Sequence, residues 1–457
     1  MLKQKPFKSI LLLTVIISIM ISGCTEQKKE TQPPEEQLTM EEKARIYVEN
    51  LSNENYNPLY MNFTEEVTSQ FSFEDLQLTW ESLISNYGTF EEIIKITKKT
   101  EQGYDVIYVT CSFSTLGNLD IRFVFNEQQL IAGFQFVPTQ TTETYSSPDY
   151  VNQSAFSEEN ITIGETPWKL PGTLSIPNGS GPYPAIILVH GSGPNDRDET
   201  IGPNKPFKDI AQGLAAKGII VLRYDKRTNV YPEASANLTN LTPQEEVITD
   251  ALAGITFLQQ YSAANISAVF LLGHSLGAMM APEIARQSNS LQAIIMLAAP
   301  ARSFEDLYLA QYQYLASLDG IIDETERQQI DAVNQSVQQI KTLNISNNET
   351  VLNAPLSYWE YLSTYNPISV TQNLSIPVLI LQGERDYQVT YEDDFLIWKQ
   401  TFQNKSMVSL QSYETLNHLF ISGSGPPTNT EYVTPGNVDQ EVITDLASWI
   451  QNHINED

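Results

Sequence analysis

Ala268-Val-Phe-Leu-Leu-Gly-His-Ser-Leu-Gly-Ala-Met-Met-Ala281 combines an apolar run, a G-x-S-x-G turn and a helix-forming segment. The pattern predicts a strand, a sharp turn and a helix, with Ser275 in a strained conformation on the turn. Side chains at Gly273 and Gly277 would collide with the neighbouring strand or helix. Ser275 is thereby exposed beyond the sheet, and the backbone N–H of Leu276 faces the oxygen that becomes negative during acyl transfer. The alternative is an ordinary junction in which the serine caps the helix.

Apolar runs and helical patterns alternate through residues 156–457. The near-continuous apolar runs are 170–176, 185–189, 219–224, 269–272, 293–297 and 378–381, and the helical patterns are 206–216, 243–261, 278–286 and 438–453. Apolar runs of this kind are typical of strands that are covered on both faces. The alternation therefore predicts the α/β class, with a mostly parallel sheet and helices on both sides.

A second turn follows the run at 185–189, in His190-Gly-Ser-Gly-Pro194. A glycine-containing loop after a buried strand can present backbone N–H groups to an anion. We expect the N–H of Ser192 to be the second oxyanion donor, with Gly191 as the alternative. His190, at the strand end, is expected to be structural.

Two further positions supply a candidate acid and base. Asp386 follows the strand predicted at 378–381, where a carboxylate could orient a histidine at the carboxyl rim of the sheet. Glu384 is the competing acid, whereas Asp393 and Asp394 are expected in the next helix. The chain has four histidines, and only His418 lies in a loop suited to a general base, the alternative being a surface histidine.

The motif Val189-His-Gly-Ser-Gly-Pro-Asn-Asp-Arg-Asp-Glu199, with the segments 202–207 and 221–228, carries a specific resemblance. It resembles the two-domain bacterial carboxylesterases of the dienelactone-hydrolase-like branch of the α/β-hydrolase superfamily. The resemblance covers nearly all of residues 156–457 and implies an α/β-hydrolase fold. It implies Ser275 as nucleophile, Asp386 as acid and His418 as base, in the chain order of that superfamily.

Charged side chains fall in two loops at the same rim. They are Asp196, Arg197, Asp198, Arg223, Asp225, Lys226 and Arg227. We expect them to pair with one another and to brace the oxyanion loop; the alternative is a solvated run of charges.

An insertion at about 303–363 separates two of the predicted strands. Its aromatic-rich helical spacing predicts a cap over the site, with Tyr308, Tyr312 and Trp359 as candidate pocket residues. The alternative is a solvated helical decoration.

The N-terminal residues have the pattern of an export signal. Three lysines precede an apolar run at 10–21, which ends in Ile21-Ser-Gly-Cys24. This end resembles the lipobox of prokaryotic lipoproteins, which implies a signal peptide at 1–23, a lipidated Cys24 and an exported, membrane-anchored protein. An ordinary signal peptide or an uncleaved anchor is the alternative. Residues 24–40, charged and proline-bearing, are expected to form a tether.

Residues 41–138 show helical spacing followed by strand-like runs, which predicts a small α+β domain with an antiparallel sheet. It resembles the small domain of unknown function that often precedes a hydrolase domain in exported prokaryotic proteins. Cys111 has strand spacing and is expected to be a core residue rather than a nucleophile. A polar linker is expected at 139–155.

The net charge of −29 argues against nucleic acid or an anionic membrane surface as a partner. No histidine pair has the spacing of metal ligands, so neither a metal nor a cofactor is expected. The hypothesis is an exported serine hydrolase that cleaves small-molecule carboxylic esters with short to medium acyl groups. A serine peptidase or amidase, and a non-catalytic binding protein on a hydrolase scaffold, are the alternatives.

Overall fold

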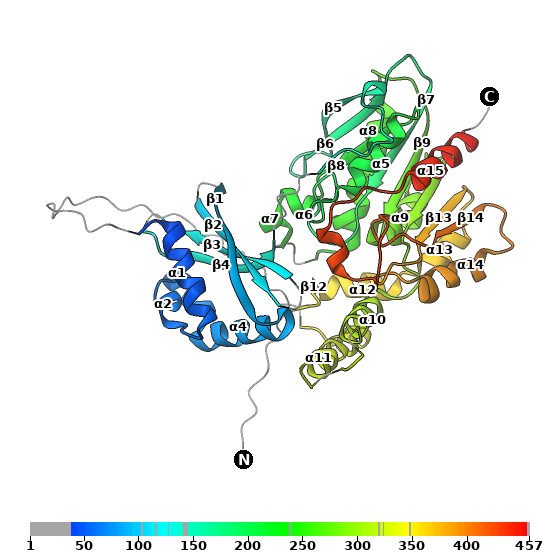
Figure 1. The fold of residues 1–457 in the computed structure, drawn as a ribbon. Coiled ribbons are helices and arrows are strands. Elements are labelled where there is room, and N and C mark those ends of the chain that lie inside the picture. Colours follow the sequence, from blue (N-terminus) through cyan, green and yellow to red (C-terminus); the bar gives the residue numbers. More distant parts are fainter. Residues whose placement is uncertain are drawn as a thin grey trace. The chain divides into compact units, whose positions relative to one another are not determined.

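The computed structural model describes residues 38–454, except 102–103, 115–116, 127, 140–144, 237, 239, 319, 323 and 347–348. The chain divides into two compact units, Met1–Thr142 and Glu143–Asp457 (Figure 1). The predicted signal peptide, Cys24 and most of the predicted tether lie outside the described residues. Within the described ranges, no helix is both long and apolar enough to span a bilayer.

The described part of the first unit has helices followed by an antiparallel sheet. The helices are α1 (Met40–Ser52), α2 (Asn57–Tyr60), α3 (Glu65–Gln70) and α4 (Phe73–Tyr87). The strands, in chain order and in sheet order, are β1 (Phe90–Glu101), β2 (Tyr104–Phe113), β3 (Gly117–Phe125) and β4 (Ile131–Pro138). Thr39 and Ser72 form capping boxes that start α1 and α4. The predicted α+β fold of this part is confirmed.

Alternate residues of β2 face the core of the first unit, among them Ile107, Val109 and Cys111. Cys111 is fully buried. Burial, with a smaller contribution from the charge of Asp120, raises the pKa of the Cys111 thiol to about 12. The reactive thiolate therefore does not form at neutral pH. As predicted, Cys111 is a core residue.

The second unit is built on an eight-stranded sheet with the order β14-β13-β10-β9-β7-β8-β6-β5. Its strands are β5 (Phe156–Ile163), β6 (Leu170–Pro177), β7 (Tyr183–Val189), β8 (Ile220–Tyr224), β9 (Ile266–His274), β10 (Ala293–Leu297), β13 (Val378–Gly383) and β14 (Val408–Tyr413). β6 pairs antiparallel with β5 and β8, and the other pairs are parallel. The predicted α/β fold is confirmed.

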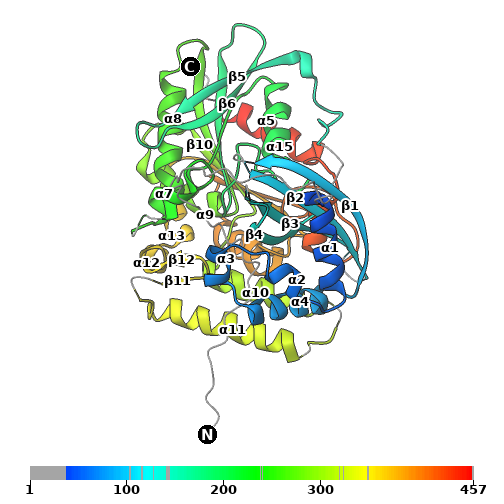
Figure 2. The same ribbon diagram turned by 90° about the vertical axis from the view of Figure 1, so that its left-hand side faces the viewer.

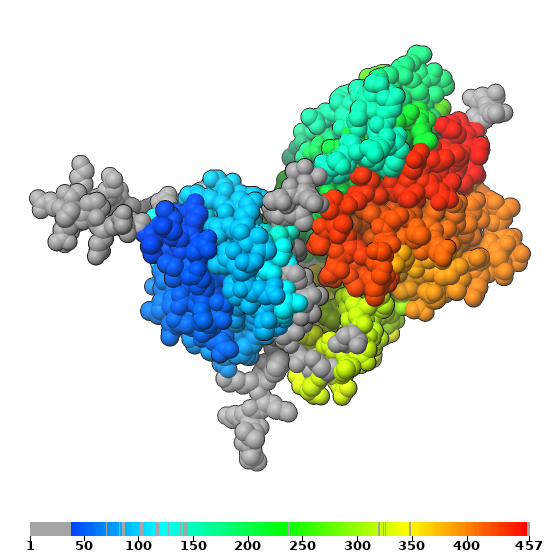
Figure 3. Space-filling view, in the orientation of Figure 1, coloured from blue at the N-terminus to red at the C-terminus, as the bar shows by residue number. Residues whose placement is uncertain are grey.

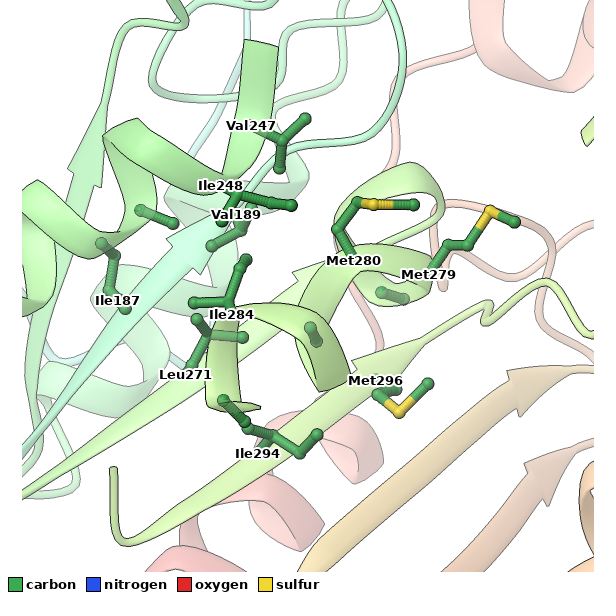
Figure 4. Close-up of a cluster of buried hydrophobic side chains, with 14 of the residues drawn as sticks. Ile187, Val189, Val247, Ile248, Leu271, Met279, Met280, Ile284, Ile294 and Met296 are labelled. Atoms are coloured by element: carbon green, nitrogen blue, oxygen red, sulfur yellow. The ribbon is translucent and has the colours of Figure 1, made fainter. Parts of the chain in front are cut away.

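Each face of this sheet has its own hydrophobic core. Along β7, Ile187 and Val189 belong to one core (Figure 4), and Ile186 and Leu188 belong to the other. The first core is covered by α8 (Thr249–Gln260), α9 (Leu276–Gln287) and α14 (Leu396–Phe402), and the second by α5 (Pro206–Ala215) and α15 (Gln440–Asn452). Burial on both faces explains why the central strands are apolar at nearly every position.

Shorter helical segments connect these elements. They are η1 (Gln153–Ala155), α6 (Arg227–Val230), α7 (Pro232–Ala236), η2 (Gln244–Ile248), α13 (Pro367–Gln372), η3 (Tyr391–Phe395) and η4 (Asn429–Val433).

The two edge strands, β5 and β14, are absent from the apolar runs that predict the sheet. Only Phe156 and Ile163, the two ends of β5, are buried, and on β14 only Tyr413 is. An edge strand is covered on fewer sides than a central one, so its sequence carries more polar residues and a weaker strand signal.

A helical insertion lies between β10 and β13. It contains α10 (Phe304–Ala316), α11 (Glu324–Lys341), the short strands β11 (Thr350–Val351) and β12 (Ala354–Pro355), and α12 (Leu356–Thr364). Figure 2 shows these elements at the end of the second unit opposite β5. Tyr314 of α10 donates a hydrogen bond to the carbonyl of Pro427. In Figure 3 the yellow-green surface of α10 and α11 adjoins the orange and red surface of the C-terminal segments.

Candidate active site

Ser275 lies on the turn between β9 and α9 with φ 53° and ψ −114°, a strained conformation for a residue with a side chain. Its backbone N–H donates to the carbonyl of Leu297 at 3.0 Å. A Cβ added at Gly273 would lie 2.2 Å from the carbonyl oxygen of Gly277, and one at Gly277 would lie 2.2 Å from that of Val189. The two glycines therefore admit the close packing that holds the turn, as predicted.

His418 and Asp386 form a buried pair. The Nδ1 of His418 lies 2.7 Å from Oδ2 of Asp386, and both side chains are nearly inaccessible. The other carboxylate oxygen, Oδ1, accepts from the backbone N–H groups of Gln388 and Val389 at 2.8 and 3.0 Å. Because a carboxylate accepts, Nδ1 carries the hydrogen, and the lone pair of Nε2 is left available as a base.

The loops that carry these two residues pack directly on each other. A Cβ on Gly383, the last residue of β13, would lie 2.4 Å from the carbonyl oxygen of Leu416. The same carbonyl accepts from the N–H of Arg385 at 3.0 Å. Backbone contacts therefore fix the distance between the turn after β13 and the loop after β14, before any side chain is considered.

The competing acids have other partners. Glu384 is exposed and accepts from the hydroxyl of Ser412 at 2.7 Å. Asp393 and Asp394 lie in η3, and both pair with Arg302. Among the acids considered from the sequence, Asp386 is the one in contact with His418.

His274 connects the serine turn to the loop of His418. Its Nε2 donates to the carbonyl of His418 at 2.9 Å, and the two imidazole rings lie 4.6 Å apart between centroids. Its Nδ1 lies 3.0 Å from Oε2 of Glu199, whose Oε1 accepts from the N–H of Gly191 at 2.6 Å. Three loops at the carboxyl rim of the sheet are thus joined through two buried side chains.

Both ring nitrogens of His274 face acceptors, the His418 carbonyl and the Glu199 carboxylate, an arrangement that favours the protonated imidazole. Burial alone lowers the pKa of His274, but the adjacent carboxylate outweighs it and the net pKa is raised. Burial raises the pKa of Glu199, yet His274 and the Gly191 N–H together lower it below its usual value. Neither residue is predicted from the sequence to act in the site, although Glu199 ends the motif that carries the family resemblance.

The hydrogen bond between Gly191 and Glu199 rules out one of the two candidates for the second oxyanion donor. The N–H of Gly191 is bound to Glu199 and cannot serve as the donor. Ser192 is exposed at the rim, and its N–H stays the predicted second donor. Gly277 lies against the backbone of Val189 and His190, so the start of α9, with the N–H of Leu276, adjoins this loop.

The charged residues of the rim pair only in part as expected. Arg197 binds Asp225 through two side-chain hydrogen bonds of 2.9 and 2.7 Å, and Arg223 binds Asp198. Lys226 and Arg227 instead pair with acids outside the two loops. Their partners are Glu246 in η2 and Asp250 in α8.

The candidate pocket residues of the insertion between β10 and β13 differ in their exposure. Trp359 is 1% exposed, and its indole N–H donates to the carbonyls of Val351 and Ala354. It belongs to the hydrophobic core, so its predicted place in an open pocket is corrected. Tyr308 and Tyr312, on α10, are partly buried and stay candidate pocket residues. No cluster of three or more His, Cys, Asp or Glu in the described residues has the arrangement of a metal site.

An eight-stranded sheet of this order, with a strained serine on the turn after its fifth strand in the chain, defines an α/β-hydrolase. Residues 184–422 match the family described as "Serine aminopeptidase, S33", and residues 44–134 match a family described as a protein of unknown function. The chain belongs to this α/β-hydrolase family of serine hydrolases.

Individual relatives extend the comparison. The chain is 40% identical to Esterase EstD of Thermotoga maritima over 438 residues, which cover 96% of this chain and 98% of that one. It is 20% identical to the uncharacterized peptidase YtmA of Bacillus subtilis over 62% of this chain and 89% of that one. Among solved structures, Est1E from Butyrivibrio proteoclasticus aligns with 65% of this chain and 99% of its own, at 16% identity and a TM-score of 0.42.

Proposed function

We propose that the chain hydrolyses carboxylic esters with short to medium acyl groups through the triad Ser275, His418 and Asp386. One observation carries the proposal: the buried His418–Asp386 hydrogen bond lies at the rim of the sheet where strained Ser275 follows β9. The identity with EstD over nearly the whole chain supports an ester as the substrate.

In the first half of the reaction, the hydroxyl of Ser275 attacks the ester carbonyl carbon while Nε2 of His418 takes its proton. The Asp386 carboxylate holds Nδ1–H of the imidazole and stabilises the imidazolium that forms. The N–H groups of Leu276 and Ser192 bind the negative oxygen of the tetrahedral intermediate. The intermediate collapses, the alcohol leaves with the proton from His418, and an acyl-serine is formed.

In the second half, His418 takes a proton from water, whose oxygen attacks the acyl-serine carbonyl. The same N–H groups bind the second tetrahedral intermediate. Its collapse returns the proton from His418 to Ser275 and releases the carboxylic acid. All five groups of this cycle belong to the chain itself, and we propose that Tyr308 and Tyr312 contact the acyl or alcohol part of the substrate.

The test has two parts. A fluorophosphonate probe should label the wild type and fail to label Ser275→Ala. Hydrolysis of p-nitrophenyl acetate and butyrate should fall by about four orders of magnitude or more in the same variant. A wild type that neither reacts with the probe nor hydrolyses an ester would instead favour the non-catalytic binding protein.

The serine peptidase alternative is supported by the description of the matching family and by the relation to YtmA. A triad alone does not distinguish an ester from an amide. Aminoacyl p-nitroanilides assayed beside the p-nitrophenyl esters decide between them. A higher kcat/KM for the anilides would replace the esterase proposal.

We also propose that the protein is exported and anchored through a lipid on Cys24. The proposal rests on the basic start, the short apolar run and the Ser22-Gly23-Cys24 end of that run. Labelling with a palmitate analogue should be lost in Cys24→Ala. Retained labelling in that variant would exclude Cys24 as the lipidated residue.

A further inference from the structure

The peptide bond between Gly191 and Ser192 contains the carbonyl of Gly191 and the N–H of Ser192, which is the proposed oxyanion donor. Hydrogen bonds to that carbonyl hold the peptide in place. The carbonyl oxygen of Gly191 accepts from Nζ of Lys226 at 2.8 Å and from the side-chain amide of Asn195 at 3.2 Å. In a trans peptide the C=O and the following N–H point in opposite directions. With its carbonyl turned toward Lys226, this peptide directs the N–H of Ser192 away from the lysine.

Lys226 is itself held in place by a buried acid. It is 2% exposed, and its Nζ lies 2.6 Å from Oε1 of Glu246. A buried ammonium is tolerated where an opposite charge and a hydrogen-bond acceptor satisfy it, and here Glu246 and the Gly191 carbonyl do so. The ammonium therefore has one position, set by the carboxylate on one side and the oxyanion loop on the other.

Glu246 is in turn bound by a helix of the insertion between β10 and β13, the predicted cap. Its Oε2 accepts from the hydroxyl of Tyr358 at 2.8 Å, and Tyr358 lies on α12 with a buried ring. A continuous series of contacts thus runs from a cap helix through Tyr358, Glu246 and Lys226 to the carbonyl of Gly191. Its members come from four segments that are far apart in the sequence.

We propose that Lys226 is a positioning residue for the oxyanion hole, and that Tyr358 and Glu246 make its position depend on the cap. The proposal deepens the proposed function and rests on it. An ammonium at the carbonyl oxygen fixes the plane of the peptide and polarises it, which makes the N–H of Ser192 a stronger donor. Because this donor acts on charge that develops in the transition state, Lys226 contributes to kcat rather than to substrate binding.

The experiment compares Lys226→Met with the wild type on p-nitrophenyl butyrate. Losing an oxyanion donor costs about 10²–10³-fold in kcat, and Asn195 still holds the carbonyl, so we expect a fall of about 10- to 100-fold. KM should stay within about 2-fold. The affinity for a trifluoromethyl ketone, which forms a tetrahedral adduct with the serine, should fall by the same factor as kcat/KM. Lys226→Arg should recover part of the loss.

The neighbouring residue provides the control. Arg227 forms a buried pair with Asp250, so Arg227→Gln removes a similar ion pair and leaves the contact between Lys226 and the Gly191 carbonyl in place. It should lower the melting temperature and leave the ratio of ketone affinity to substrate KM unchanged. A Lys226→Met variant that behaves like Arg227→Gln in this ratio would overturn the proposal.

A second variant covers the case in which Lys226→Met does not fold. Tyr358→Phe deletes one hydroxyl and should lower kcat by about 2- to 5-fold, since it loosens Glu246 without removing it. As for Lys226→Met, KM should change little, and the ketone affinity should fall by the same factor as kcat/KM. The effect of Tyr358→Phe should vanish in a Lys226→Gln background, which removes the cation held by Glu246, if Tyr358 acts through the lysine, and an undiminished effect there would overturn the coupling. A wild type inactive toward both the ester and a fluorophosphonate would overturn the proposed function itself, whereas an active wild type with unchanged variants would overturn only this inference.

Discussion

Among single residues, the site depends on two glycine positions that have no room for a side chain. Ser275 has a positive φ that packing on both sides must maintain. Gly273 and Gly277 provide that packing because each lies against backbone atoms that cannot move aside. The strain is therefore a property of the junction as a whole, and a methyl group at either glycine should release it.

Gly277→Ala should unfold the turn or move it. The new Cβ would meet the carbonyl oxygen of Val189 at 2.2 Å, and we expect a loss of about 3 kcal/mol or more with no fluorophosphonate labelling. Gly218→Ala is the matched control. Gly218 has φ 89° and no atom near the added Cβ, so only the backbone conformation should cost about 1 kcal/mol. Urea unfolding and probe labelling measure both variants, and equal effects would contradict the steric argument.

The buried Glu199–His274 pair should make stability depend on pH. The pKa of His274 is raised, so its contribution is complete below its unfolded value of 6.5 and is lost as pH rises through the folded value. The pKa of Glu199 is lowered, so its contribution is complete above 4.5 and is lost as pH falls. Glu199→Gln should therefore be most destabilising, by about 3 kcal/mol, between pH 4.5 and 6.5.

Urea unfolding of the wild type and Glu199→Gln from pH 4 to 9 tests this window. The exposed Glu384 provides the control, since Glu384→Gln should give a small difference at every pH. A difference between the wild type and Glu199→Gln that rises steadily above pH 6.5 would show that the pair is not charged in the folded state.

Among the elements, the carboxyl ends of the parallel strands place the candidate catalytic residues at one edge of the sheet. The turn after β9 carries Ser275, the turn after β13 carries Asp386 and the loop after β14 carries His418. Parallel strands end at the same edge, so three residues from distant parts of the chain lie at one rim. The amino-terminal ends of α5 and α15 are joined in a different way, through Asp209.

Asp209 of α5 accepts from the N–H of Val438 and from the hydroxyl of Tyr145. Burial raises its pKa to about 6, and the hydrogen bonds offset part of that effect. A raised carboxyl pKa means that stability from this group is complete below 3.8 and is lost as pH rises through 6. The loss is at most about 3 kcal/mol, from 1.36 kcal/mol per unit. Asp209→Asn should abolish this slope, and urea unfolding between pH 4 and 7.5 should show it; parallel curves would refute it.

At the scale of the whole molecule, each unit has a hydrophobic core of its own. The core of the first unit is formed by α1–α4 and the sheet β1–β4, and the two cores of the second unit flank its eight-stranded sheet. A unit with a separate core can unfold separately. The hydrolase residues all belong to the second unit.

Residues 145–457 alone should therefore fold and retain fluorophosphonate labelling at Ser275. In the full chain, Cys111 reports the first unit, because its thiol is buried and its pKa is about 12. In a Cys24→Ala variant, maleimide should react with Cys111 only at urea concentrations that unfold this unit. Reaction in native buffer, or loss of labelling in the 145–457 fragment, would show that the units are not independent.

Much of this organisation follows from local sequence. Apolar runs that alternate with helical patterns predict the class of the fold, and a turn whose glycines are required by sterics within a few residues predicts Ser275 as the nucleophile. Asp386 and His418 are predicted as acid and base because each lies in a turn or loop that follows a predicted strand. The edge strand β5 and the bounds of β14 are not predicted, because few side chains of either strand are buried.

The local sequence is enough to predict the strand, turn and helix around Ser275, because backbone sterics and side-chain periodicity act over short distances. Which polar groups meet depends on the folded chain. Glu199 reaches His274, His274 reaches the carbonyl of His418 144 residues away, and Lys226 reaches Gly191. Nothing in the spacing of these residues predicts such contacts, since they exist only where the folded sheet brings its loops to one rim and excludes water from them.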